Sequence, residues 1–117
     1  TSRKIKILRK RLFNMPLLKL QSEYNDLDKY DNYGDIYYYK KDSYISHNPY
    51  GFAYITKNGY KAYLIENKIH RLDGPAVIYP NGEEEYYINN EYLTLEEFEK
   101  HPERLKYLGK EYLICLT

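Results

Sequence analysis

The sequence contains no tryptophan, one cysteine and one methionine among its 117 residues. Because Cys115 is the only cysteine, a disulfide within the chain and a zinc site built from cysteines are excluded. No apolar run approaches the ~20 residues that a transmembrane helix needs, and no signal peptide is visible. These absences favour a cytoplasmic or virion-associated protein and argue against a secreted one.

Tyrosine is what the chain has in excess, with 17 Tyr against 3 Phe. Tyr, Ile and Thr suit half-buried pleated surfaces, so this composition favours strands. The heavy use of Tyr, Asn, Lys and Ile is also typical of AT-rich genomes, including many phages and large DNA viruses. The length suits one compact domain.

The net charge of +1 conceals a strong segregation. Residues 1–20 hold seven basic and no acidic side chains, so the remainder is acidic, with 11 basic and 17 acidic residues. This pattern predicts a basic arm on an acidic body. Six of the cations form a candidate partner-binding group, namely Arg3, Lys4, Lys6, Arg9, Lys10 and Arg11.

The arm has three alternative roles. Its apolar stripe, with Ile5, Leu8 and Leu12 on one side of a helix, would pack on the body of the protein. Its positive charges would instead neutralise the phosphates of a nucleic acid. The third alternative is an anionic membrane surface.

The centre of the chain is a repeat. HNPYGFAYITKNG (47–59) returns as HRLDGPAVIYPNG (70–82), and a shift of 23 superposes identical residues without a gap. The matches continue to Tyr63 on Tyr86 and Asn67 on Asn90. A degraded copy, NYGDIYYYKKDS (32–43), precedes them when Tyr33-Gly34 is placed on Tyr50-Gly51. Such self-similarity is the signature of a repeat architecture.

Each copy contains Asn-Gly between two apolar runs, which is the strongest short hairpin signal because a type I′ turn needs positive φ at both central residues. We therefore expect hairpins that pair residues 52–57 with 60–65 and 75–80 with 83–88. In that register Tyr54 lies opposite Tyr63, and Val77 lies opposite Tyr86.

The unit resembles a MORN repeat, and the phrase NKIHRLDGPAVIYPNGEEEYYINNEY resembles the divergent MORN-like repeats of phage and giant-virus proteins. It departs from the usual pattern in having Tyr86-Tyr87 in place of Trp and Pro75-Ala76 where a second Gly is common. The resemblance implies an elongated sheet of stacked hairpins. It does not imply one activity, because family members serve as interaction scaffolds, junction proteins and proposed lipid-binding surfaces. The structural repeat positions are His47, Gly51, Asn58, Gly59, Tyr63, His70, Asp73, Gly74, Asn81, Gly82 and Tyr86.

Helices are expected on both flanks. The helical spacing of the arm continues through Leu17, Leu20, Tyr24 and Leu27. After the repeats, Thr94 and Glu97 form a capping box for a short helix. His101-Pro102 begins another helix, with Leu105 and Leu108 inward and Gly109 at its end. Residues 111–117 read as a terminal strand.

The predicted fold class is therefore α+β: stacked antiparallel hairpin repeats with N-terminal and C-terminal helical caps. The single domain divides into a basic helical arm (1–31), hairpin repeats (32–93), and a helical cap with a terminal strand (94–117).

Catalysis is disfavoured, because no phosphate loop, nucleophile elbow, metalloprotease motif or triad spacing is present. His47 and His70 occupy the same repeat position, so stacking separates them by about 10 Å, too far for a shared metal ion. We expect each imidazole to bond a loop carbonyl. Glu83, Glu84 and Glu85 read as a solvated hairpin end.

No cofactor or metal is therefore expected. The function expected is a non-catalytic protein–protein interaction or structural module, of the viral or phage accessory kind, whose exposed tyrosines contact a protein partner. The alternatives are a nucleic-acid-associated protein that uses the arm and a peripheral lipid-binding module. Oligomerisation through the sheet edges is a further expectation.

Overall fold

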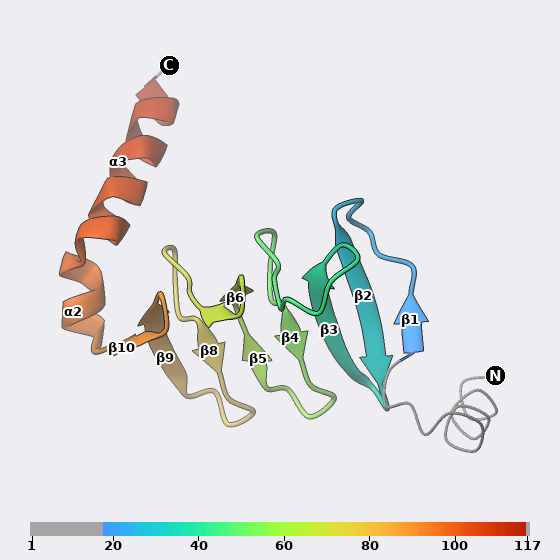
Figure 1. Ribbon diagram of the computed structural model, residues 1–117. Coiled ribbons are helices and arrows are strands. Elements are labelled where there is room, and N and C mark those ends of the chain that lie inside the picture. Colours follow the sequence, from blue (N-terminus) through green and yellow to red (C-terminus); the bar gives the residue numbers. More distant parts are fainter. Residues whose placement is uncertain (1–17, 117) are drawn as a thin grey trace.

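The computed structural model describes residues 18–116 and the side chains of residues 18–109 (Figure 1). The fold is α+β: an eight-stranded antiparallel sheet followed by two C-terminal helices. The shape is elongated, with extents of 53 × 33 × 20 Å. The strands of the sheet, in spatial order, are β1 (Leu18–Leu20), β2 (Leu27–Asn32), β3 (Asp35–Lys40), β4 (Tyr54–Ile55), β5 (Lys61–Ala62), β8 (Val77–Ile78), β9 (Glu84–Ile88) and β10 (Glu91–Leu93).

A second, two-stranded sheet lies beside the main one and joins β6 (Leu64–Ile65) to β7 (Lys68–Ile69). Beyond β10 the chain forms α2 (Leu95–Lys100) and α3 (Pro102–Leu116), at the opposite end of the sheet from β1 (Figure 1). Consecutive hairpins therefore follow one another along the sheet in chain order, as the repeat predicts.

The two predicted hairpins are confirmed, because β4 pairs with β5 around Asn58-Gly59 and β8 pairs with β9 around Asn81-Gly82. The predicted turn type is wrong. Within these two turns, glycine alone has positive φ, +107° at Gly59 and +90° at Gly82. The N–H of Thr56 donates to the carbonyl of Tyr60 at 2.8 Å, which leaves three residues in the loop. A three-residue loop with a left-handed glycine is the common alternative to a two-residue turn.

The extra loop residue moves the register by one position. Tyr54 lies opposite Ala62 rather than Tyr63, and Val77 lies opposite Glu85 rather than Tyr86. Because side chains alternate between the faces of a sheet, a one-residue shift sends every following side chain to the other face. Tyr63 and Tyr86 therefore project from the face opposite to that of Tyr54.

Two-residue turns occur elsewhere, where the sequence did not predict them. Ile65 pairs with Lys68 around Glu66-Asn67, with φ of +49° and +67°. Ile88 pairs with Glu91 around Asn89-Asn90, with φ of +50° and +69°. Positive φ at both central residues is the type I′ pattern. Each repeat unit thus contains two hairpins rather than one.

The strands of the degraded first copy pair as the later ones do, but Tyr38 precedes its equivalent, Tyr63, by 25 residues rather than by the 17 that place Tyr33-Gly34 on Tyr50-Gly51. The N–H of Tyr38 donates to the carbonyl of Ala53, as the N–H of Tyr63 donates to that of Ala76, both at 2.8 Å. Gly34 has φ of +100° and occupies the turn position of Gly59. The offset is larger because the connection from Lys40 to His47 is two residues longer than the equivalent connection in the next repeat, from Ile65 to His70.

Three expectations about the flanks are wrong or lie outside the described residues. The helix expected through Leu20 and Leu27 is wrong, because these residues lie in β1 and β2, which pair with each other. Its earlier part, in residues 1–17, lies outside the described residues. The terminal strand is also wrong: α3 continues through Gly109 to Leu116.

The inward orientation expected for two leucines of α3 is wrong as well. Leu105 and Leu108 are 53% and 41% exposed. Both lie in a helix, as their spacing predicts, but α3 extends away from the sheet (Figure 1).

The capping box of α2 is confirmed. The hydroxyl of Thr94 accepts from the N–H of Glu97, and the carboxylate of Glu97 accepts from the N–H of Thr94. This cap orients a short helix whose Phe98 is 2% exposed and packs with Ile88 and Leu93. The C-terminal end of the sheet is thereby closed by an apolar cap.

The two faces of the sheet differ. The loop face carries Tyr38, Ala53, Tyr63, Ala76 and Tyr86 in one row, covered by connecting loops and by Phe98. The tyrosine face carries the alternate residues, and its central row reads Tyr30, Tyr37, Tyr54, Ala62, Val77 and Glu85.

Candidate functional site

The tyrosine face is a row of aromatic rings. Tyr37 stacks on Tyr54 with ring centroids 4.7 Å apart, Tyr54 contacts Tyr60 at 5.7 Å, and Tyr60 contacts Tyr79 at 5.5 Å. At the other end of the face Tyr30 and Tyr37 both contact Tyr39. The nine members are Tyr30, Tyr37, Tyr39, Tyr44, Tyr54, Tyr60, Tyr79, Tyr87 and Tyr92.

Glu85 links Tyr79 to Tyr87, between which no ring contact occurs in the described row. Its carboxylate accepts from the hydroxyl of Tyr79 at 2.8 Å and from that of Tyr87 at 3.3 Å. The hydrogen bond to Glu85 raises the pKa of Tyr79 to about 12. A hydrogen bond to Tyr37, together with burial, raises the pKa of Tyr54 to about 12. The proton of Tyr79 is thus held by Glu85 within the tyrosine face.

The row is half-buried at its centre and exposed at its ends, where Tyr44 and Tyr92 are 79% and 58% exposed. Phe98 places α2 on the loop face, so the helices of the described chain leave the tyrosine face uncovered. Tyr hydroxyls and ring edges offer contact area with few rotatable bonds, a composition typical of protein interfaces.

On the loop face the two repeat histidines have the same structural role. Nδ1 of His47 accepts from the N–H of Glu66 at 3.1 Å, and Nδ1 of His70 accepts from the N–H of Asn89 at 3.0 Å. The expectation that they bond loop carbonyls is therefore wrong, because Nδ1 of each ring accepts a hydrogen bond from a backbone N–H. Each imidazole fixes the first residue of a two-residue turn.

Adjacent repeats meet on the loop face at what we call inter-repeat slots, one between each pair of consecutive loops. In the first slot Tyr50 folds back over Tyr24, with ring centroids 4.4 Å apart and the planes 24° from parallel. Its hydroxyl donates to Asp26 at 2.9 Å. An aromatic ring from the second repeat thus closes the gap beside the first.

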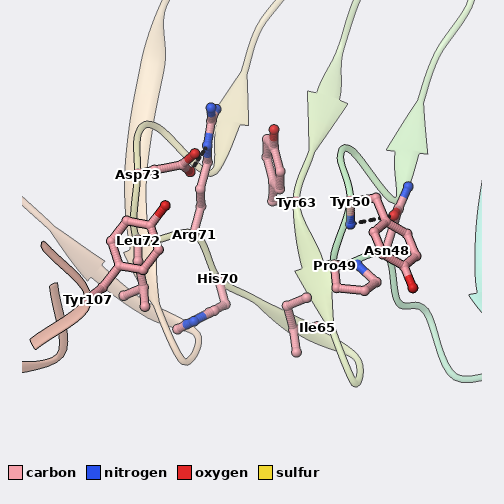
Figure 2. A pocket seen from close by; sticks show the side chains of 10 residues that line it. All are labelled: Asn48, Pro49, Tyr50, Tyr63, Ile65, His70, Arg71, Leu72, Asp73 and Tyr107. Carbon is pink, nitrogen blue, oxygen red and sulfur yellow. Dashed lines mark hydrogen bonds and ion pairs between the residues drawn. The ribbon is translucent and has the colours of Figure 1, made fainter. Parts of the chain in front are cut away.

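In the second slot that ring is missing. The position equivalent to Tyr50 is Asp73, whose carboxylate turns back to Arg71 at 2.7 Å. A cavity of about 240 Å³ remains between the loops at 48–50 and 70–73, with Tyr63 and Ile65 between them and Tyr107 at one side (Figure 2). The slot combines apolar and polar walls.

Arg71 forms one wall of this second slot. Its guanidinium lies 4.2 Å from the ring centroid of Tyr63, a cation–π contact. It also donates through Nη1 to the carbonyl of Pro75 at 3.0 Å. In the preceding repeat the amide of Asn48 makes the equivalent bond, to the carbonyl of Phe52 at 2.9 Å. The two residues fix their loops in the same way although their chemistry differs.

At the third slot the helices cover the ring of Tyr86. Phe98 packs on Tyr86 with centroids 4.7 Å apart, and the guanidinium of Arg104 lies 4.5 Å from the Phe98 ring. Arg104 also donates to the carbonyl of Leu72 at 2.6 Å. The middle slot has no counterpart of the Tyr50 ring, because Asp73 stands at that position.

The structure brings three of the predicted repeat positions together, since Tyr63, His70 and Asp73 line the second slot. Gly59, Gly82 and the asparagines before them, Asn58 and Asn81, form the opposite, turn end of the hairpins, where Asn81 Oδ1 accepts from the N–H of Glu83. Gly51 and Gly74 lie in the loops at the slots, and Tyr86 contacts Phe98. The arm cations, Arg3 to Arg11, lie outside the described residues.

Sequence reasoning missed Asn48, Tyr50 and Arg71. The available signal was the repeat alignment itself: position 50 changes from Tyr to Asp at 73 within an otherwise similar phrase. Such a change alone does not reveal a cavity, because the contact of Tyr50 is with Tyr24, which lies outside the aligned segment.

Within residues 18–109, no group of three or more His, Cys, Asp or Glu side chains is arranged to hold a metal ion. Neither α2 nor the described length of α3 is long and apolar enough to cross a membrane. No protein-family model, curated protein or solved structure matches the chain. Function is therefore inferred from the geometry of the two surfaces described above.

Proposed function

We propose that the protein is a non-catalytic protein–protein interaction module built from MORN-like hairpin repeats, with the tyrosine face as its binding surface. The observation that carries this proposal is the row of nine tyrosines on a sheet face that the described helices leave uncovered. The composition and the repeat phrase favour a viral or phage accessory or structural protein as its setting.

The orientation of the rings favours a polypeptide partner over a nucleic acid. Tyr37 and Tyr54 lie face to face at 4.7 Å, so each ring covers one face of the other. Tyr60 meets Tyr79 at 71° and Tyr39 meets Tyr44 at 80°. Base stacking needs free ring faces along a strand, whereas ring edges and hydroxyls suit backbone amides and side chains.

The experiment is affinity capture from a lysate of the native host or from native virions. We compare the wild-type chain with a Tyr44→Ser/Tyr92→Ser variant, since both rings are largely exposed and their loss leaves the core intact. A Leu95→Ser/Leu105→Ser variant, which removes exposed apolar groups from α2 and α3, is the matched control. We expect one protein to be retained by the wild type and by the control and lost from the tyrosine variant. Equal retention by all three would contradict the tyrosine face as the binding surface.

The second candidate function is nucleic-acid association through the arm. The observation in its favour is the run of six cations without an acidic residue between Arg3 and Arg11. The acidic remainder of the chain opposes it, because negative charge repels phosphate beyond the arm. The third candidate function is peripheral lipid binding, in which the same cations of the arm would contact an anionic membrane surface.

A further inference from the structure

We infer that the second inter-repeat slot is a binding site for an aromatic side chain, specifically a tyrosine, presented by a partner polypeptide. The site lies on the loop face, so it is separate from the tyrosine face and does not depend on the function proposed for that face.

The repeat itself supplies the first observation. In the first slot the ring of Tyr50 packs on Tyr24, and in the third the ring of Phe98 packs on Tyr86. The middle slot has the carboxylate of Asp73 at the position of Tyr50, and Pro49 lines its opposite wall. The large ring of Tyr50 is thus replaced by a smaller group in the middle slot, which leaves the space open.

The size of the slot suits one aromatic ring. The open slot measures about 240 Å³, and a cavity of about 150 Å³ is enough to hold benzene. A phenol ring fits with room for its hydroxyl. A larger, flat ligand is disfavoured because the slot is bounded by the 48–50 loop on one side and by Leu72 and Tyr107 on the other (Figure 2).

The chemistry of the walls selects tyrosine. They supply an aromatic ring from Tyr63, apolar groups from Pro49 and Ile65, and the guanidinium of Arg71. The side chain of Asp73 is 54% exposed and pairs with Arg71 through one oxygen. A carboxylate has about four acceptor sites, so it can also accept from a phenol hydroxyl. The first slot contains that same bond, between Tyr50 and Asp26. A tyrosine therefore satisfies both the apolar walls and the acid, and a leucine satisfies only the walls.

The test is an NMR titration in which peptides are added to the full chain and chemical-shift changes report binding. The three peptides are blocked pentapeptides with Tyr, Phe or Leu at the centre and glycine at the other four positions. Free p-cresol is a fourth probe. We expect the Tyr peptide to bind about tenfold more tightly than the Leu peptide, which corresponds to a difference of about 1.4 kcal/mol in binding free energy. The shifts should centre on Tyr63, Ile65 and Arg71. Equal affinity for the Tyr and Leu peptides would overturn the proposal. Binding of p-cresol as tight as that of the Tyr peptide would show a small-molecule site and overturn the polypeptide assignment.

Two variants locate the site. Asp73→Tyr restores the residue that closes the first slot, and we expect it to abolish Tyr-peptide binding while the amide spectrum stays folded. Glu83→Tyr adds the same ring at an exposed position of a hairpin end and should leave binding unchanged.

A third variant tests the acid even if Asp73→Tyr does not fold. Asp73→Asn keeps the shape of the side chain and removes its charge. We expect it to weaken binding of the Tyr peptide several-fold and to leave binding of the Phe peptide unaffected. Unaltered Tyr-peptide binding in Asp73→Asn would contradict the assigned role of the carboxylate.

Discussion

His70 accepts a hydrogen bond from the backbone N–H of Asn89, with 3.0 Å between Nδ1 and N, and so fixes the first residue of the turn between β9 and β10. His47 does the same for Glu66 one repeat earlier. The acceptor nitrogen must be unprotonated in both cases. Burial lowers the pKa of both imidazoles below the usual value of 6.5. Lys40 lowers the pKa of His47 further, while Glu103 opposes the effect of burial on the pKa of His70.

Stability should therefore fall as the pH falls. Because the pKa of each histidine is lower in the folded than in the unfolded chain, the unfolded state binds protons first. The contribution of each histidine to the stability is complete above a pH of about 6.5, the pKa of histidine in the unfolded chain. It is lost as the pH falls through the lower pKa of the folded chain. We expect the midpoint of thermal unfolding to drop between pH 7.5 and pH 5.5. His47→Asn/His70→Asn offers an amide oxygen near each acceptor position and should show a flatter profile. An unchanged drop in that variant would assign the effect to other groups.

Substitutions of Gly82 and Gly109 should change the free energy of unfolding in opposite directions. Gly82 has φ of +90° and open space where a Cβ would lie, so Gly82→Val should cost about 1–3 kcal/mol through backbone strain alone. Gly109 lies inside α3, also with open space around it. Gly109→Ala should stabilise the protein by up to about 1 kcal/mol, because alanine favours the helix. Urea unfolding measures both. A stabilising Gly82→Val would mean that the turn is assigned wrongly.

The cap of α2 should contribute measurably to stability. Thr94→Ala removes the hydroxyl that accepts from Glu97, and we expect a loss of about 1 kcal/mol in the free energy of unfolding. Thr94→Asp keeps an acceptor at the same position and should restore most of the loss. If Thr94→Ala and Thr94→Asp were equally destabilised, the hydrogen bond would not be the cause.

Charge reversal in the arm separates packing from phosphate binding. We expect Arg9→Glu/Arg11→Glu to fold normally and to leave retention on DNA or RNA columns unchanged, because the apolar stripe rather than the charge is expected to dock the arm. Deletion of residues 1–13 should then lower thermal stability. A clear loss of salt-sensitive retention in the charge-reversed variant would favour the nucleic-acid function instead.

Sequence alone determined the features that depend on neighbouring residues. The 23-residue period is visible in the sequence itself. The hairpins at Asn58-Gly59 and Asn81-Gly82 and the capping box at Thr94 follow from local backbone preferences. Turn type and register did not follow, because Asn-Gly suits both a two-residue and a three-residue loop. The one-residue difference decided which tyrosines share a face.

Tertiary structure decided everything that depends on partners distant in sequence. Leu20 and Leu27 have helical spacing, yet strand pairing between β1 and β2 prevails. Residues 111–116 have an apolar strand-like pattern, but they continue the helix that begins at Pro102. The tyrosine row arises from strands placed side by side, and the open slot arises because Asp73 turns to Arg71 where Tyr50 reaches Tyr24. Local propensity determines where turns and caps lie, whereas a surface or a cavity exists only once separate strands and loops have packed together.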